Sequence, residues 1–139
     1  MILVDSGPLI AAAITDDRDH RRCVDLFATL HLNSERLLVP QTVLAEVAYA
    51  IQKLGGTEQE LMFLQSLADE DLVLVDLIAE DIPRVIELVR TYRDFPLGTT
   101  DASVIALAER LEITEIATLD QRHFPNVRPR HADYLTLLP

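Results

Sequence analysis

Two aspartates follow short apolar runs of the kind that form buried strands. Asp5 ends the run over residues 2–5, and Asp120 comes directly after residues 115–119. In open parallel sheets the ligand crevice lies beyond the carboxyl ends of the strands. We therefore expect both carboxylates to open onto one crevice.

Two further acids lie on predicted helices. Asp101 begins the helix predicted over residues 100–111, which is apolar on most sides and should be buried, so that its first turn brings Asp101 to the same rim. Glu46, in the helix predicted over residues 41–54, is expected to share the direction of an apolar stripe. That stripe consists of Val43, Val47, Ala50 and Leu54. A glutamate on such a face is costly unless it is paired or bound to a cation.

Each of these acids also has a structural explanation, as a helix cap, a first-turn acid, a turn residue or the edge of an apolar face. Asp76 likewise ends a predicted strand. The four acids differ from it because they are expected to meet at one place with no close cation in sequence, the nearest being Arg122 and Lys53. Crowded carboxylates repel one another unless a divalent cation joins them. Hard oxygen ligands suit Mg²⁺ or Mn²⁺.

Short apolar runs alternate along the chain with segments of helical periodicity. Strands are predicted at residues 2–5, 37–39, 72–75, 115–119 and 134–138, and helices at 16–30, 41–54, 57–68, 80–93 and 100–111. Thr57 is expected to cap its helix, with Glu60 at capping-box spacing. Strands without polar alternation suit a parallel sheet covered on both faces. The sequence therefore predicts an α/β sandwich of about four to five parallel strands.

Length and composition indicate one domain over residues 1–139. The chain has 12 basic and 23 acidic residues and a net charge of −11, which is the wrong sign for a broad nucleic-acid-binding surface. Cys23 is the only cysteine, so an internal disulfide is excluded, and it should be a buried thiol in a helical stripe. No apolar run is long enough for a membrane span, and the N-terminal residues lack the basic flank of a signal peptide. A cytoplasmic location is expected.

A basic segment directly follows Asp120. Residues 121–131 contain Arg122, Arg128 and Arg130 and no acid. These arginines are candidates to bind the phosphates of RNA, and the alternative is an ordinary solvated loop.

Taken in order, the four acids resemble the pattern of the PIN domain, and particularly of the VapC toxins. The resemblance extends over the whole chain, through Val4-Asp5-Ser6, Leu44-Ala45-Glu46-Val47, Leu97-Gly98-Thr99-Thr100-Asp101-Ala102 and Ala117-Thr118-Leu119-Asp120-Gln121-Arg122-His123-Phe124. It implies a parallel sheet with helices on both sides and a site for Mg²⁺ or Mn²⁺. Asp5 and Asp101 would be the main ligands, and Glu46 and Asp120 would complete the site. Ser6 and Thr100 would orient the ligands or a water, and Asp76, on an edge strand, would lie outside the site.

The resemblance also implies an activity and partners. The expected activity is that of an endoribonuclease toxin, usually a homodimer, neutralised by a cognate antitoxin whose C-terminal segment lies in a groove near the acids. The apolar faces of residues 41–54 and 57–68 are candidates for that groove or for the core. Two alternatives stay open: a PIN nuclease of RNA maturation without an antitoxin, and a non-catalytic acidic protein-binding module. A phosphatase of the haloacid dehalogenase type would need a second aspartate where Gly7 stands, and no Gly-x-Ser-x-Gly elbow is present.

Overall fold

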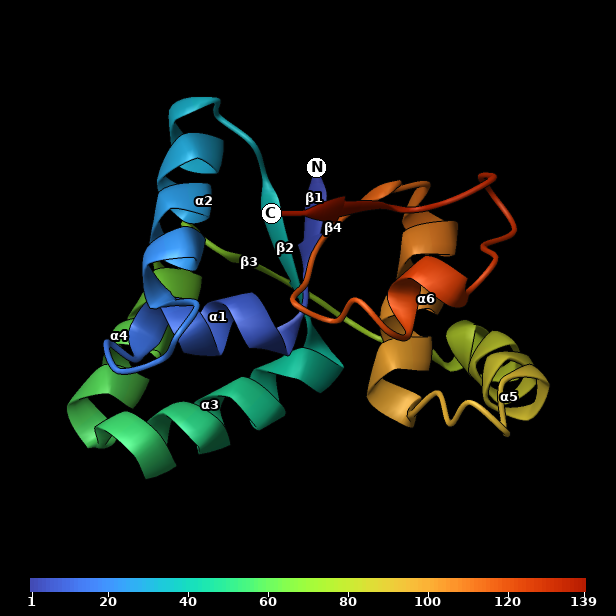
Figure 1. Ribbon diagram of the computed structural model, residues 1–139, viewed down its shortest axis with the longest axis horizontal. Coiled ribbons are helices and arrows are strands. Elements are labelled where there is room, and N and C mark those ends of the chain that lie inside the picture. Colours follow the sequence, from blue (N-terminus) through green and yellow to red (C-terminus); the bar gives the residue numbers. More distant parts are fainter.

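The computed structural model describes residues 1–139, and a five-stranded parallel sheet forms its centre (Figure 1). The strand order is β3-β2-β1-β4-β5. The strands are β1 (Ile2–Val4), β2 (Leu37–Pro40), β3 (Val73–Val75), β4 (Glu115–Ala117) and β5 (Thr136–Leu138). Leu3 of the central strand pairs with Leu38 on one side and Ile116 on the other. All pairings are parallel, so the carboxyl ends of the strands lie at one edge of the sheet.

Six α-helices surround the sheet: α1 (Ser6–Ala13), α2 (His20–Leu32), α3 (Gln41–Gly55), α4 (Thr57–Ala68), α5 (Ile82–Thr91) and α6 (Thr99–Leu111). In Figure 1, α1, α2 and α4 lie on one side of the sheet and α5 and α6 on the other, while α3 runs along its lower edge. Two short 3₁₀ helices, Ala79–Asp81 and Phe124–Asn126, complete the elements. The predicted α/β sandwich with a parallel sheet is confirmed. No helix is both long and apolar enough to cross a bilayer.

The central strands β1 and β2 and helix α6 could be predicted from the sequence because their residues are buried in continuous runs. All three residues of β1 and all four of β2 are buried, and residues 102–108 of α6 are buried without interruption. A helix buried on every side needs small side chains where it meets the sheet closely, which accounts for its alanines. Cys23 is also fully buried, as expected, and burial raises the pKa of its thiol.

Several predicted boundaries were wrong. Helix α1 was not predicted because Gly7-Pro8 resembles a chain break, yet Pro8 lies in the first turn, where no intrahelical N–H bond is needed. Helix α2 begins at His20 rather than at residue 16, because the Asp17 side chain accepts a hydrogen bond from the Asp19 N–H (2.8 Å) and holds a turn there. Thr57 is the first residue of α4 and does not cap it, since Gly56 occupies the cap position with φ of 88°.

Candidate active site

Asp5 lies at the carboxyl end of the central strand and is almost completely buried, with 6% of its surface exposed. Its N–H donates to the Ala117 carbonyl (2.9 Å), and its Oδ2 accepts a hydrogen bond from the Thr118 hydroxyl (2.8 Å). Burial raises the pKa of Asp5, and the Ser6 amide and the Thr118 hydroxyl act in the opposite direction. No side-chain capping bond to α1 is present, so helix capping does not explain this aspartate. Its carboxylate is fixed by Thr118, which directly follows the neighbouring strand β4.

Asp101 reaches the same edge from the first turn of α6. It is half-buried, and its pKa is raised to about 6, first by burial and then by the charges of Asp5 and Asp120. No arginine or lysine forms an ion pair with it. An acid this close to other acids is held in a state that favours binding of a proton or a cation.

Asp120 lies in the turn after β4 and is held by several donors. Its Oδ1 accepts hydrogen bonds from the N–H groups of Arg122 and His123 (both 2.8 Å), and its Oδ2 lies 2.8 Å from Nδ1 of His123. Burial raises the pKa of Asp120, but these hydrogen bonds outweigh it and the net pKa is lowered. Asp120 therefore stays ionised more readily than Asp5 or Asp101.

Glu46 lies on α3 within electrostatic reach of the other acids, since its charge raises the pKa of both Asp5 and Asp101. Its predicted place on a buried stripe was wrong. The buried face of α3 consists of Val43, Val47 and Ile51, whereas Glu46 is exposed and Leu54, expected in that stripe, is 63% exposed. Glu46 borders the site from the solvent side. We call Asp5, Glu46, Asp101 and Asp120 the acidic cluster.

Hydroxyl groups support the cluster at positions that sequence reasoning missed. Thr118 is fully buried and bridges Asp5 to the Asp120 N–H, which donates to the Thr118 hydroxyl (3.0 Å). The Ser103 hydroxyl donates to the Thr100 carbonyl and contacts the Thr42 hydroxyl, both at 2.6 Å, which joins α6 to α3. The only sequence signal was a polar side chain inside an apolar run.

Ser6 and Thr100, which were expected to orient the acids, form no hydrogen bond to a carboxylate through their hydroxyl groups. Both residues are half-buried. Thr100 contributes its carbonyl to the hydroxyl pair of Ser103 and Thr42 instead. Asp76 is exposed at the end of the edge strand β3 and does not belong to the acidic cluster.

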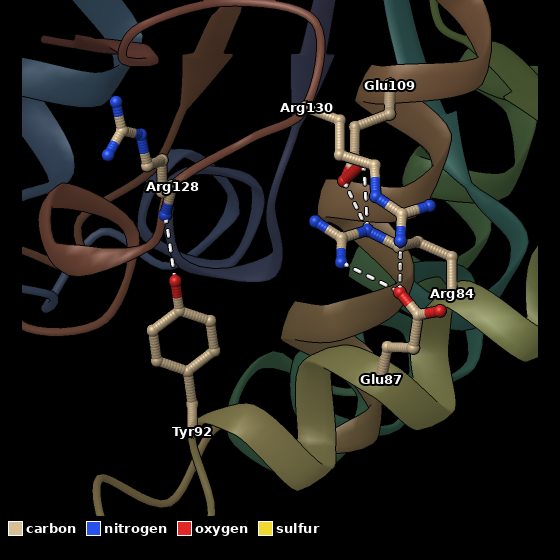
Figure 2. A network of polar contacts seen from close by, with 6 residues as sticks. All are labelled: Arg84, Glu87, Tyr92, Glu109, Arg128 and Arg130. Atoms are coloured by element: carbon tan, nitrogen blue, oxygen red, sulfur yellow. Dashed lines mark hydrogen bonds and ion pairs between the residues drawn. The ribbon is translucent and has the colours of Figure 1, made fainter.

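The three arginines of residues 121–131 differ in their surroundings. Arg122 is exposed, with its guanidinium 6.0 Å from the centre of the Phe95 ring, and Arg128 is exposed and forms no ion pair. Arg130 instead forms an ion pair with Glu87 on α5, and Figure 2 shows its guanidinium directed into this network. Arg122 and Arg128 are therefore free to bind an anion, whereas Arg130 has an internal partner.

The donor set fits a hard divalent cation. Asp101, Asp120 and His123 offer ligand atoms that all lie within 4.8 Å of one another, and Asp5 and Glu46 add carboxylates nearby. Most of these ligands are oxygens, which suits Mg²⁺ or Mn²⁺. The pKa of Asp101 is raised first by burial and then by the neighbouring acids, and a bound cation would favour its ionised form.

The fold and the site together define an α/β domain with an acidic centre at the carboxyl edge of a parallel sheet. A family model described as the PIN domain matches residues 2–128, so the chain belongs to the PIN-domain family. The resemblance inferred from the four acids is confirmed at the level of the family.

Individual relatives are similar over nearly the whole chain. Ribonuclease VapC26 of Mycobacterium tuberculosis (strain ATCC 25618 / H37Rv) is 30% identical over 141 residues, which cover 99% of this chain and all of that protein. The crystal structure of M. tuberculosis VapC20, described as a Sarcin-Ricin loop cleaving toxin, has a TM-score of 0.77 at 16% identity, covering 87% of this chain and 91% of that one. VapBC2 from Rickettsia felis, crystallised with a DNA fragment from its promoter, has a TM-score of 0.68 at 19% identity, covering 99% and 97%. These two structures support the fold.

Proposed function

We propose that this chain is an endoribonuclease dependent on Mg²⁺ or Mn²⁺ and the toxin component of a type II toxin–antitoxin pair. The observation that carries the proposal is the acidic cluster, whose members come from β1, α3, α6 and the turn after β4. Similarity to a ribonuclease and to toxin structures supports this reading over the alternatives. The proposal includes one domain over residues 1–139 acting in the cytoplasm.

In this proposal the carboxylates of Asp5, Asp101 and Asp120, with Glu46, hold the cation. A bound divalent ion supplies charge that polarises a phosphate and lowers the pKa of a water. Asp5, fixed by Thr118, and Asp120, fixed by the Arg122 and His123 amides, define the position of the centre. Glu46 is exposed and unpaired, so it is placed to accept the proton of an attacking water.

The test is cleavage of a structured RNA mixture in Mg²⁺ or Mn²⁺. We expect Asp101→Asn to reduce cleavage by more than about 100-fold, because residues that merely support a metal ligand already cost about 10- to 100-fold. Asp76→Asn is the matched control, an acid at the end of a strand outside the cluster, and it should cleave as the wild type does. Equal cleavage by wild type and Asp101→Asn, or none by the folded wild type, would contradict the proposal.

The proposed antitoxin has a candidate groove between α1, α2 and α4. A hollow of about 650 Å³ there is lined by apolar side chains that include Leu9, Phe27 and Phe63, and by Met62, which is 64% exposed. The groove was expected near the acids, but this hollow includes Leu37 and Leu72 at the amino ends of β2 and β3 and none of the acidic cluster. Helix α3 contributes no residue to it, so only α4 of the two helices expected there does so. An acidic toxin suits a basic antitoxin segment. We expect Met62→Lys to weaken binding of the cognate antitoxin in calorimetry while Tyr49→Lys, exposed outside the groove, does not; equal binding by both variants would contradict this placement.

A homodimer is also part of the proposal. Helix α5 exposes Ile82 and Ile86 beside a hollow of about 660 Å³, which is a candidate contact surface. Light scattering should give the mass of a dimer for the wild type and a lower mass for Ile86→Lys. Leu32→Lys, on the exposed end of α2, is the control; an unchanged mass for Ile86→Lys would place the contact elsewhere.

A further inference from the structure

Three aromatic rings lead away from the acidic cluster toward the end of α5. His123 contacts Asp120 through Nδ1, and its ring meets the Phe95 ring edge to face, with centroids 5.0 Å apart. The Phe95 ring lies 6.5 Å from that of Tyr92. All three rings remain partly exposed, although they come from two distant segments of the chain. We call Tyr92, Phe95 and His123 the aromatic row.

Two arginines without an acidic partner border this row. Arg122 lies over Phe95, and the Arg128 N–H donates to the Tyr92 hydroxyl (3.0 Å). Figure 2 shows the Arg128 side chain directed away from Tyr92, with no contact to the ion-pair network around Glu87. The backbone of the basic segment is thus held by Tyr92, directly after α5, and neither arginine has an acidic partner for its guanidinium.

Arginines beside exposed aromatic rings are typical of proteins that bind single-stranded nucleic acid. Bases stack on aromatic side chains, and arginines neutralise the phosphates between them. A duplex does not fit this chemistry, because its bases are already stacked on one another. A chain with a net charge of −11 cannot attract RNA through its whole surface, so local cations beside the acids must carry the contact.

We propose that the aromatic row with Arg122 and Arg128 is the subsite for the single-stranded RNA segment next to the scissile phosphate. This inference rests on the proposed nuclease function. A base stacks on the exposed part of Phe95, and the two guanidinium groups bind the neighbouring phosphates. His123 links the subsite to the cluster, since it touches both Phe95 and Asp120.

The test measures binding apart from cleavage. Fluorescence anisotropy follows a fluorescein-labelled random-sequence oligoribonucleotide in Mg²⁺, with every variant made in the Asp101→Asn background. We expect Phe95→Ala to weaken binding by about 5- to 150-fold, the usual effect of losing one stacking ring, and Phe95→Tyr to restore it. Arg122→Gln and Arg128→Gln should each reduce the slope of log affinity against log salt by about 0.7.

The control is Arg21→Gln, an exposed arginine on α2 that also lacks an ion pair and lies outside the subsite. It should bind as the parent protein does. Because Arg122 is exposed, its variant folds even where Phe95→Ala is destabilised. Unchanged affinity in Phe95→Ala and unchanged salt slopes in both arginine variants would overturn the subsite. If the wild type then still cleaves RNA, the nuclease proposal stands and only the subsite fails.

Discussion

Both ends of α6 carry an acidic residue, but only the one near the C-terminal end forms an ion pair with an arginine. Near its C-terminal end, Glu109 accepts two hydrogen bonds from Arg84 Nε (2.9 and 3.0 Å), and Arg110 pairs with the buried Asp81 (2.9 Å). Figure 2 shows the first of these contacts continuing to Glu87 and Arg130. At the N-terminal end, Asp101 faces other acids and has no cation of the chain for a partner.

The two acids differ in role: Glu109 is paired within the fold, whereas Asp101 is unpaired and is proposed to bind a ligand. Arg84 neutralises Glu109, and this ion pair holds α5 against α6. Asp101 has no arginine or lysine partner, and this arrangement is the one expected if, as proposed, the site binds a cation. Three predictions test the contrast.

The largest effect on stability is expected from Glu109→Ala. Arg84 is only 18% exposed, and without Glu109 its one remaining acidic partner is Glu87, which is itself 48% exposed. We expect the free energy of unfolding to fall by about 3 kcal/mol in urea denaturation. Glu58→Ala, an exposed first-turn acid of α4, should change it little; an equal loss in both variants would remove the distinction between the two ends of α6.

Divalent ions should stabilise the acidic end. At a Mn²⁺ concentration about 100-fold above its Kd, the free energy of unfolding should rise by about 2.7 kcal/mol, because the ion binds only the folded state. The melting temperature of the wild type should therefore increase with Mn²⁺, and that of Asp101→Asn much less. An increase of the same size in both would show that the ion binds elsewhere.

The smallest effect is the dependence of metal-free stability on pH. The pKa of Asp101 is raised from 3.8 to about 6, so the folded state holds its proton more tightly than the unfolded chain does. Stability contributed by this group is present below pH 3.8 and is lost as pH rises to about 6. Since Asp101 is half exposed and partly screened, we expect a loss of about 1 kcal/mol.

The measurement is urea denaturation of the metal-free protein between about pH 4.5 and about pH 7.5. Other carboxylates titrate in the same range, so the informative quantity is the difference between wild type and Asp101→Asn. The substitution should stabilise the protein at the higher pH and have little effect at the lower. The opposite sign would mean that Asp101 is paired in the folded state.

The sequence predicted well wherever burial was continuous. Strands β1, β2 and β4, helix α6 and the positions of Asp5 and Asp101 followed from apolar runs that only a central sheet and a buried helix can accommodate. The edge strands β3 and β5 were also predicted, although both are partly exposed. Boundaries set by local hydrogen bonds were less visible, as at Asp17 before α2 and Gly56 before α4.

The supporting residues of the site were beyond the reach of periodicity. Thr118 and His123 act through contacts with Asp5, Asp120 and Phe95 that depend on the packing of distant segments. The prediction for Glu46 was wrong for a related reason. A helical stripe in the sequence gives the direction of the buried face only to within one residue, and the buried face of α3 is rotated toward Ile51. Family membership does not specify such contacts, so the structure was needed for them.

The hydrogen bond from Thr118 to Asp5 joins residues 113 positions apart in the chain. Synthesis proceeds from the N-terminus, so Asp5 leaves the ribosome long before Thr118, the residue that fixes it, has been translated. Pairing of β1 with β4 is a late, long-range step whose loop-closure entropy delays it further. Incomplete chains therefore cannot assemble the acidic cluster, which forms only after nearly the whole domain has been translated.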